Sequence, residues 1–112
     1  MSSTDALDLV YAALADPTRR DIVIRLSRGD ATVTELAEPH DLTFQAISQH
    51  IKVLEAGGLV SRSRVGRTRP CHLEATPLGE AISWLEDARQ VWTERLDRLE
   101  TYLDASQGER DV

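Results

Sequence analysis

The stretch "LTFQAISQHIKVLEAGGLVSRSRVGRTRPCHLEA", which runs from Leu42 to Ala75, contains two hydrophobic patterns in succession. In its first half, apolar residues recur every three to four positions, which predicts a helix. Thr43 is the expected N-cap of that helix, and Gly57-Gly58 is its expected end. The second half predicts two short strands around Gly66. A helix followed by a β-hairpin is therefore the centre of the predicted fold.

Three shorter helices are predicted before this stretch. The first covers Asp5–Ala15, and Asp16 then caps a second helix that has Pro17 at its first position. Thr34 is the expected cap of a third helix, which is brief because Pro39 disfavours helical geometry at the residue before it. A short helix, a turn and a longer helix form a helix-turn-helix pattern.

A long final helix is predicted to begin with Thr76 as cap and Pro77 as first residue, and to end at about Leu103. Its apolar residues alternate steps of three and four, as in a coiled-coil seam. The seam consists of Leu78, Ile82, Leu85, Trp92, Leu96, Leu99 and Leu103, with Arg89 interrupting it. Because this stripe exceeds what a small domain needs for its own core, part of it is expected to meet a partner helix.

Length and composition are those of an ordinary globular protein. The 112 residues, 41% hydrophobic and 29% charged, predict one domain over residues 1–104, with a dimerisation helix at 77–103 and a disordered tail at 105–112. No apolar run approaches the roughly 18 residues that span a bilayer, so no membrane contact is expected. A single cysteine, Cys71, excludes an internal disulfide, and a cytoplasmic location is expected.

Positive charge is concentrated in the middle of the chain, although the formal net charge is -6. Residues 1–42 carry four arginines against eight acidic residues, giving -4. Residues 43–72 carry five basic residues against one glutamate, giving +4, and residues 73–112 carry four against ten, giving -6. A local basic patch in an acidic chain is typical of a phosphate-binding surface.

The helix after Thr43 has two distinct faces. On a helical wheel, the apolar residues fall within about 80° of arc; they are Phe44, Ile47, Ile51 and Leu54. The opposite face carries Gln45, Ser48, Gln49 and Lys52, with His50 at the border in a secondary role. Glutamine can bind adenine at two atoms, serine can bind a base or a phosphate, and lysine supplies phosphate charge. The alternative is a plain solvated face.

The hairpin carries four arginines in eight residues: Arg62, Arg64, Arg67 and Arg69. Such a hairpin can lie along a DNA backbone or enter a narrow minor groove. The alternative is a solvated hairpin whose charges protect an edge strand from aggregation. Next to a helix-turn-helix, the arginines favour DNA binding.

Three segments together resemble the ArsR/SmtB family of small dimeric winged-helix transcriptional repressors. They are "ALADPTRRDIVIRL" at 13–26, "ISQHIKVLEAGGLV" within the central stretch, and "TPLGEAISWL" at the start of the last helix. The resemblance implies a recognition helix whose DNA-facing residues are Thr43, Gln45, Ser48, Gln49, His50 and Lys52, and a wing centred on Gly66-Arg67. It also implies dimerisation through the first and last helices. Residues expected at that interface are Leu7, Val10, Tyr11, Leu85, Trp92, Leu96, Leu99 and Leu103.

No metal, cofactor or catalytic site is predicted. Many members of that family hold metal through a cysteine pair in the third helix, whereas this chain reads "ELAEPHD" there. The chain looks most like the branch described as metal-independent regulators. Cys71 and His72 are neighbours on a strand and point to opposite faces, and His40 and His50 are dispersed. Cys71 is expected to be a small buried side chain, although Arg69 nearby raises the alternative of a lowered thiol pKa.

The prediction is a mainly α winged helix-turn-helix protein with a small β-hairpin. It is expected to act as a homodimeric repressor of its own or neighbouring genes on an inverted-repeat operator in double-stranded DNA. Residues 43–56 would enter the major groove, and the arginine wing at 62–69 would contact the backbone or the minor groove. The alternative is a winged-helix protein-interaction module without specific DNA binding. The sequence identifies no small-molecule effector.

Overall fold

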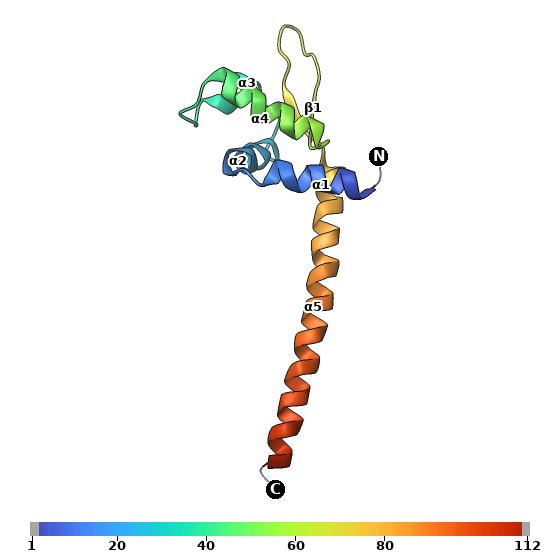
Figure 1. The fold of residues 1–112 in the computed structure, drawn as a ribbon. Coiled ribbons are helices and arrows are strands. Elements are labelled where there is room, and N and C mark those ends of the chain that lie inside the picture. Colours follow the sequence, from blue (N-terminus) through green and yellow to red (C-terminus); the bar gives the residue numbers. More distant parts are fainter. Residues whose placement is uncertain (1–2, 111–112) are drawn as a thin grey trace. The chain divides into compact units, whose positions relative to one another are not determined.

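The computed structural model describes the backbone of residues 3–110 and the side chains of residues 5–106. The chain divides into two compact units, Met1–Ala81 and Ile82–Val112. The elements follow the order α1 (Ser3–Leu14), α2 (Pro17–Leu26), α3 (Val33–Ala37), α4 (Phe44–Ala56), β1 (Val60–Arg62), β2 (Cys71–Leu73) and α5 (Ala75–Arg110). Figure 1 shows this order along the colour ramp. The predicted order of four helices, a hairpin and a long helix is confirmed.

The predicted start of α2 is confirmed in detail. The Asp16 carboxylate accepts a hydrogen bond from the backbone N–H of Arg19 at 3.1 Å, and Pro17 is the first helical residue. That hydrogen bond is the main reason why the pKa of Asp16 lies below its ordinary value of 3.8. The cap therefore holds the α1–α2 turn in place at neutral pH.

The predicted cap of α3 is wrong by two residues. Thr32, not Thr34, is the N-cap, and it forms a reciprocal capping box with Glu35. The Thr32 hydroxyl accepts the Glu35 N–H at 3.2 Å, and the Glu35 carboxylate accepts the Thr32 N–H at 3.0 Å. The bonds that the Glu35 carboxylate accepts from the N–H and from the hydroxyl of Thr32 keep the pKa of Glu35 below its ordinary value. Thr32 is favoured because a glutamate lies three residues after it, whereas Ala37 follows Thr34 at that spacing.

Helix α4 begins and ends where the sequence predicts. The Thr43 side chain caps it by accepting the Ala46 N–H at 3.1 Å. At the other end, Gly58 has a φ of +75°, a left-handed conformation that residues with a Cβ seldom adopt. This stop turns the chain directly into β1.

The hairpin that follows is antiparallel, and it pairs Val60 with Leu73 and Arg62 with Cys71. Beyond the strands, Val65 and Thr68 exchange two backbone hydrogen bonds of 2.9 and 3.0 Å around the tip. Gly66 at the tip has a φ of +63°, as the first central position of a type II′ turn requires. Cys71 also pairs with Ala31 before α3, so β2 joins the hairpin to the helix-turn-helix.

One apolar core unites the elements of the first unit. It is made of Val10, Ala13, Ile22, Val23, Leu26, Ala31, Val33, Leu36, Ile47, Ile51, Leu54, Leu59, Val60, Cys71 and Ala81. Val10, which was predicted at the dimer interface, is only 3% exposed here, so it has no free area for a partner. Leu7 and Tyr11 lie beside it, half-buried against the same core.

Helix α5 begins earlier and ends later than predicted. It starts at Ala75, so Thr76 and Pro77 are its second and third residues rather than its cap and first residue. Proline is tolerated there because the first-turn N–H groups have no intrahelical partner. The helix continues to Arg110, into the segment 105–112 for which a disordered tail was predicted, and residues 111–112 lie outside the described residues.

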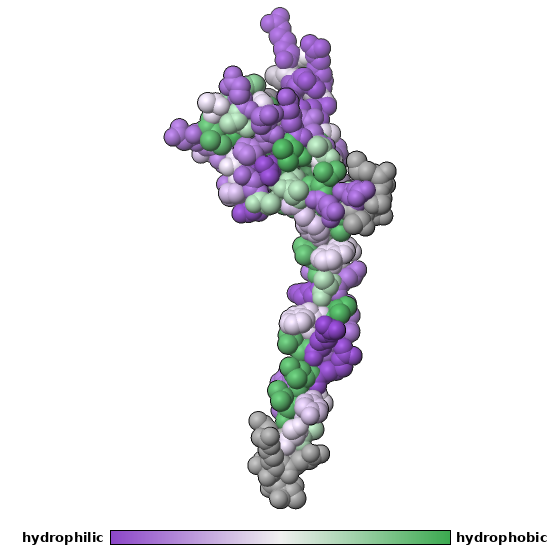
Figure 2. All heavy atoms as spheres, viewed as in Figure 1, coloured by the Kyte–Doolittle hydropathy of each residue, from purple (hydrophilic) through white to green (hydrophobic). Residues whose placement is uncertain are grey.

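The second unit exposes the predicted seam of α5. From Ile82 to Leu103 the apolar side chains of the seam are about half exposed, from 47% at Leu96 to 59% at Trp92, whereas Leu78 is partly buried against the core of the first unit. Figure 2 shows hydrophobic residues along this part of the helix. Within the part of the chain that the structure describes, no helix is long and apolar enough to cross a membrane.

Candidate nucleic-acid interface

The predicted polar face of α4 is present in the structure. Gln45, Gln49 and Lys52 are exposed, and Ser48 between them is half-buried. The opposite face holds Ile47, Ile51 and Leu54 at no more than 1% exposure. The core therefore fixes which side of α4 faces outward, and two amides, a hydroxyl and an ammonium group share that side.

Phe44 departs from the predicted apolar arc. It is 55% exposed, although its wheel position is close to that of the buried Ile51. As the first residue of α4, it precedes the turn at which the core begins. It lines a shallow groove together with Thr34 of α3 and with Arg62, Thr68 and Arg69 of the hairpin. A phenyl ring is thus added to the polar surface, where it can contact a thymine methyl group.

The hairpin presents three of its four arginines to solvent. Arg64, Arg67 and Arg69 are exposed around the tip, whereas Arg62 is half-buried. Arg62 donates from Nη2 to the carbonyl of Arg69 at 3.0 Å, which ties the two strands together below the tip. In Figure 2 hydrophilic side chains cover the projecting hairpin that Figure 1 draws above β1. Arg62 therefore has a structural role in the hairpin in addition to supplying positive charge.

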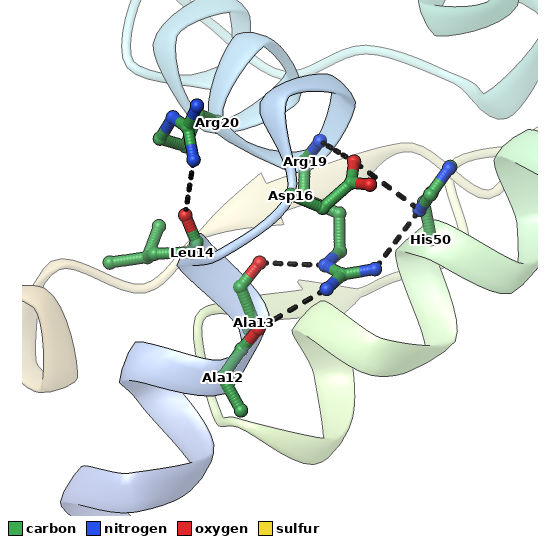
Figure 3. A network of polar contacts seen from close by, with 7 residues as sticks. All are labelled: Ala12, Ala13, Leu14, Asp16, Arg19, Arg20 and His50. Atoms are coloured by element: carbon green, nitrogen blue, oxygen red, sulfur yellow. Dashed lines mark hydrogen bonds and ion pairs between the residues drawn. The ribbon is translucent and has the colours of Figure 1, made fainter.

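His50 lies on the flank of α4. It is in contact with Asp16, the residue just before α2, and with Arg19 of α2. Its Nδ1 is 3.3 Å from Arg19 Nη1 and 3.9 Å from the Asp16 carboxylate. The guanidinium of Arg19 also donates to the carbonyls of Ala13 at 2.6 Å and Ala12 at 3.1 Å. Figure 3 shows these contacts converging on Arg19. The His50 side chain is only 22% exposed, unlike the exposed Gln45, Gln49 and Lys52 of the polar face.

Sequence reasoning did not identify Arg19 as part of this site. A signal was nevertheless present in "DPTRR", because two arginines in the first turns of α2 are unfavourable beside the positive end of a helix dipole. Both find acceptors elsewhere: Arg20 donates to the carbonyl of Leu14 at 2.9 Å, at the end of α1. Cations are favourable at that negative helix end.

Cys71 is a buried core residue, as the sequence favoured. Its exposure is 0%, and burial raises the pKa of its thiol above the ordinary 9.0, against the smaller opposing effect of Arg62. The alternative of a pKa lowered by Arg69 is therefore wrong. His72 beside it is exposed, so the two side chains do point to opposite faces of the strand.

No group of three or more His, Cys, Asp or Glu side chains gathers into a possible metal site among the described residues. His40 lies after α3 and His50 on α4, while His72 is on β2. These residues belong to separate parts of the first unit.

An ion pair joins the hairpin to the loop before α3. His72 Nδ1 lies 2.8 Å from Asp30 Oδ1, with both side chains about half exposed. The hydrogen bond that His72 donates to Asp30, followed by the negative charge of Asp30, raises the pKa of His72 above its ordinary value of 6.5. Because protonated His72 is favoured in the folded state, this contribution to stability is full below pH 6.5 and is lost as pH rises through the folded pKa.

We expect Asp30→Asn to remove this pH dependence. In a histidine-ring NMR titration, the pKa of His72 should fall in the variant relative to the native chain. The difference in melting temperature between the two proteins should be largest at mildly acidic pH and should shrink at pH 8.5. An unchanged His72 pKa in the variant would show that the pair does not form in solution.

A helix-turn-helix with a polar outward face beside an arginine-bearing hairpin defines the class of winged-helix DNA-binding proteins. A family model described as "Helix-turn-helix domain" matches residues 14–62. The HTH-type transcriptional regulator Rv2034 of Mycobacterium tuberculosis is 37% identical over 105 residues, which cover 94% of this chain and 95% of that protein. The transcriptional repressor SdpR of Bacillus subtilis is 34% identical, covering 68% of this chain and 84% of its own.

A solved structure agrees with these relatives. An ArsR-like transcriptional regulator from Rhodococcus sp. RHA1 superposes with a TM-score of 0.76 at 32% identity, covering 90% of this chain and 95% of that one. The chain belongs to the ArsR family of winged helix-turn-helix transcriptional regulators, as the sequence motifs implied. It is a DNA-binding regulator, and the alternative of an interaction module without DNA binding is not favoured.

Proposed function

We propose that this regulator is a homodimeric repressor that binds an inverted-repeat operator in the cytoplasm. It would repress by occupying the DNA and would catalyse no reaction. The observation that carries the proposal is the exposed polar face of α4 beside the hairpin arginines. Gln45, Ser48 and Gln49 would read base edges in the major groove, while Lys52 and the wing contact phosphates. The Thr43 hydroxyl oxygen accepts the Ala46 N–H, so its own hydrogen can still be donated. It would donate this hydrogen to the DNA backbone at the start of the helix.

The wing would bind beside the recognition helix. Arg64, Arg67 and Arg69 are exposed and permanently charged, which suits a phosphate backbone or a narrow minor groove. Arg62 would contribute charge from the base of the hairpin. Repression is proposed because a dimer seated on an operator blocks access to the promoter, and because SdpR is named a repressor.

A homodimer is supported by the seam of α5. Leu85, Trp92 and Leu96 are about half exposed, and Leu99 and Leu103 continue the same stripe. Exposed apolar residues at heptad spacing favour a second helix. Leu7 and Tyr11 of α1 are the proposed contribution of the first helix. Two-fold symmetry would then place two recognition helices roughly 34 Å apart in successive major grooves.

The test is selection of duplexes from a random library by the native protein, followed by fluorescence anisotropy on the enriched duplex and a scrambled control. An inverted repeat should be enriched, and a chelator should not change its affinity. If each protomer neutralises about four phosphates, log K should fall with log salt at a slope near -7. Absence of any enriched sequence would contradict sequence-specific binding, and a slope shallower than about -3 would contradict a wing on the backbone.

Two substitutions should separate base reading from phosphate binding. Gln49→Ala is expected to cost about 1–3 kcal/mol on the selected operator and little on scrambled DNA. Arg67→Ala should weaken binding to both duplexes and reduce the salt slope by about 1. Anisotropy titrations at several salt concentrations measure both effects. If Gln49→Ala also weakened binding to both duplexes equally, α4 would not be the base-reading element.

A further inference from the structure

The contact between Arg19 and His50 joins the end of α1 to the flank of α4. Two arms of the guanidinium donate to the Ala13 and Ala12 carbonyls, at 2.6 and 3.1 Å. These carbonyls lie in the last turn of α1, where the N–H groups four residues further on are no longer part of the helix. Ala12 also accepts the backbone N–H of Ala15 at 3.2 Å. The remaining arm, Nη1, lies 3.3 Å from His50 Nδ1. Figure 3 shows the guanidinium between the helix end and the imidazole ring.

The chemistry of the pair determines which ring nitrogen carries hydrogen. A guanidinium has only donors and stays protonated in proteins. Nδ1 of His50 must therefore accept, which places the ring hydrogen on Nε2 in neutral His50. The Asp16 carboxylate, at 3.9 Å from Nδ1, is too far for a hydrogen bond, and it accepts the backbone N–H of Arg19 instead.

We propose that Arg19 positions the recognition helix through His50, which makes His50 a positioning residue and not a DNA contact. The inference deepens the proposed function, because it assumes that the polar face of α4 reads DNA. The apolar contacts of Ile47, Ile51 and Leu54 fix which side of α4 faces outward, but they are non-directional, so small rotations of the helix change them little. A hydrogen bond is directional, and this one fixes the flank next to Gln49.

Two substitutions at position 50 separate positioning from DNA contact. In His50→Asn, the side-chain oxygen stands where Nδ1 stood, so it can still accept from Arg19. In His50→Gln, the polar atoms move out to the distance of Nε2 from the backbone, and the acceptor at Nδ1 is lost. We expect His50→Asn to keep operator affinity within about threefold and His50→Gln to lower it about tenfold, the effect of losing one hydrogen bond to a charged group. The opposite order would show that Nε2 contacts DNA and would overturn the proposal.

Arg20 supplies a matched control for Arg19. Both side chains donate to carbonyls at the end of α1, but only Arg19 has a described hydrogen bond to α4. Arg19→Gln should lower operator affinity about tenfold, while Arg20→Gln should leave it unchanged. In the double variant Arg19→Gln/His50→Gln, the loss should be no larger than in either single variant, because one contact is removed in all three. Equal losses for Arg19→Gln and Arg20→Gln would indicate only a general effect on α1 and α2.

Two readouts distinguish positioning from loss of a phosphate contact or of folding. The salt slope of Arg19→Gln should equal that of the native protein, since no phosphate contact is removed, whereas Arg67→Ala should flatten it. Ring ¹⁵N shifts of neutral His50 should report the Nε2–H tautomer in the native chain and a mixture in Arg19→Gln. Circular dichroism melts check that each variant is folded. Arg19→Lys keeps the positive charge but not the planar set of guanidinium donors, so it repeats the test with a milder change.

The two hypotheses fail in distinguishable ways. If the native protein does not prefer its selected duplex over the scrambled one, the proposed function fails. If it does, and Arg19→Gln binds that duplex as tightly as the native protein, only the role of Arg19 fails. A neutral His50 with its hydrogen on Nδ1 in the native chain would also overturn this inference alone.

Discussion

Leu99→Glu is expected to convert the protein to a monomer and to lower its affinity for an inverted-repeat operator by more than about a hundredfold. Leu99 is 53% exposed in the single chain, on the heptad seam of α5, so a partner helix would bury it. A carboxylate buried there without a cation is strongly unfavourable. A monomer engages one half-site and loses the effective concentration that links the two recognition helices.

Sedimentation velocity measures the first part of this expectation, and anisotropy on the selected operator measures the second. Leu96→Glu, one turn earlier on the same stripe, should behave in the same way. Thr101→Glu is the matched control, because it adds the same charge on the opposite side of the helix, where Thr101 is exposed. An unchanged sedimentation coefficient for Leu96→Glu and Leu99→Glu would contradict the seam as a dimer interface.

Leu54→Ala is expected to reduce the free energy of unfolding by about 2–5 kcal/mol. Leu54 is fully buried, on the face of α4 that packs in the core. Its truncation removes apolar contacts and leaves a cavity that the surrounding helices only partly fill. Against a typical total of about 5–15 kcal/mol for a domain, this loss is large.

Phe44→Ala is the control for this prediction, because Phe44 belongs to the same helix and is a larger side chain. At 55% exposure more than half of its surface is already in water, so its truncation should cost about 1–2 kcal/mol, less than that of Leu54. Urea unfolding at one fixed protein concentration compares the two variants, because the stability of the proposed dimer would depend on concentration. Equal losses would mean that Phe44 is buried in the folded protein in solution.

The two faces of α4 were predictable because they depend on local periodicity. Ile47, Ile51 and Leu54 recur at helical spacing, and their burial turns Gln45 and Gln49 outward. Phe44 could not be placed in this way, because a helical wheel treats every turn alike. Whether the first turn of a helix reaches the core depends on where the other helices end, and the wheel holds no such information.

Helix ends were predictable only where one capping arrangement was possible. Thr43 and Asp16 had no competitor, and both caps are present. Thr32 and Thr34 competed, and Glu35 decides between them through its reciprocal bond. The end of α5 was predicted too early because the prediction placed it at Leu103, the last residue of the apolar stripe. The sequence after Leu103 contains no proline, and a helix exposed to solvent can continue beyond such a stripe.

The sequence by itself determined the family, the order of the elements and the polar face of α4. Caps, turn glycines and helical periodicity act between residues only a few positions apart, so they can be read directly. The tertiary structure alone decided that Phe44 is exposed, that burial raises the pKa of Cys71, and that Arg19 holds His50. Arg19 and His50 are 31 positions apart, and burial and long-range hydrogen bonds arise only when the closing core brings such distant residues together.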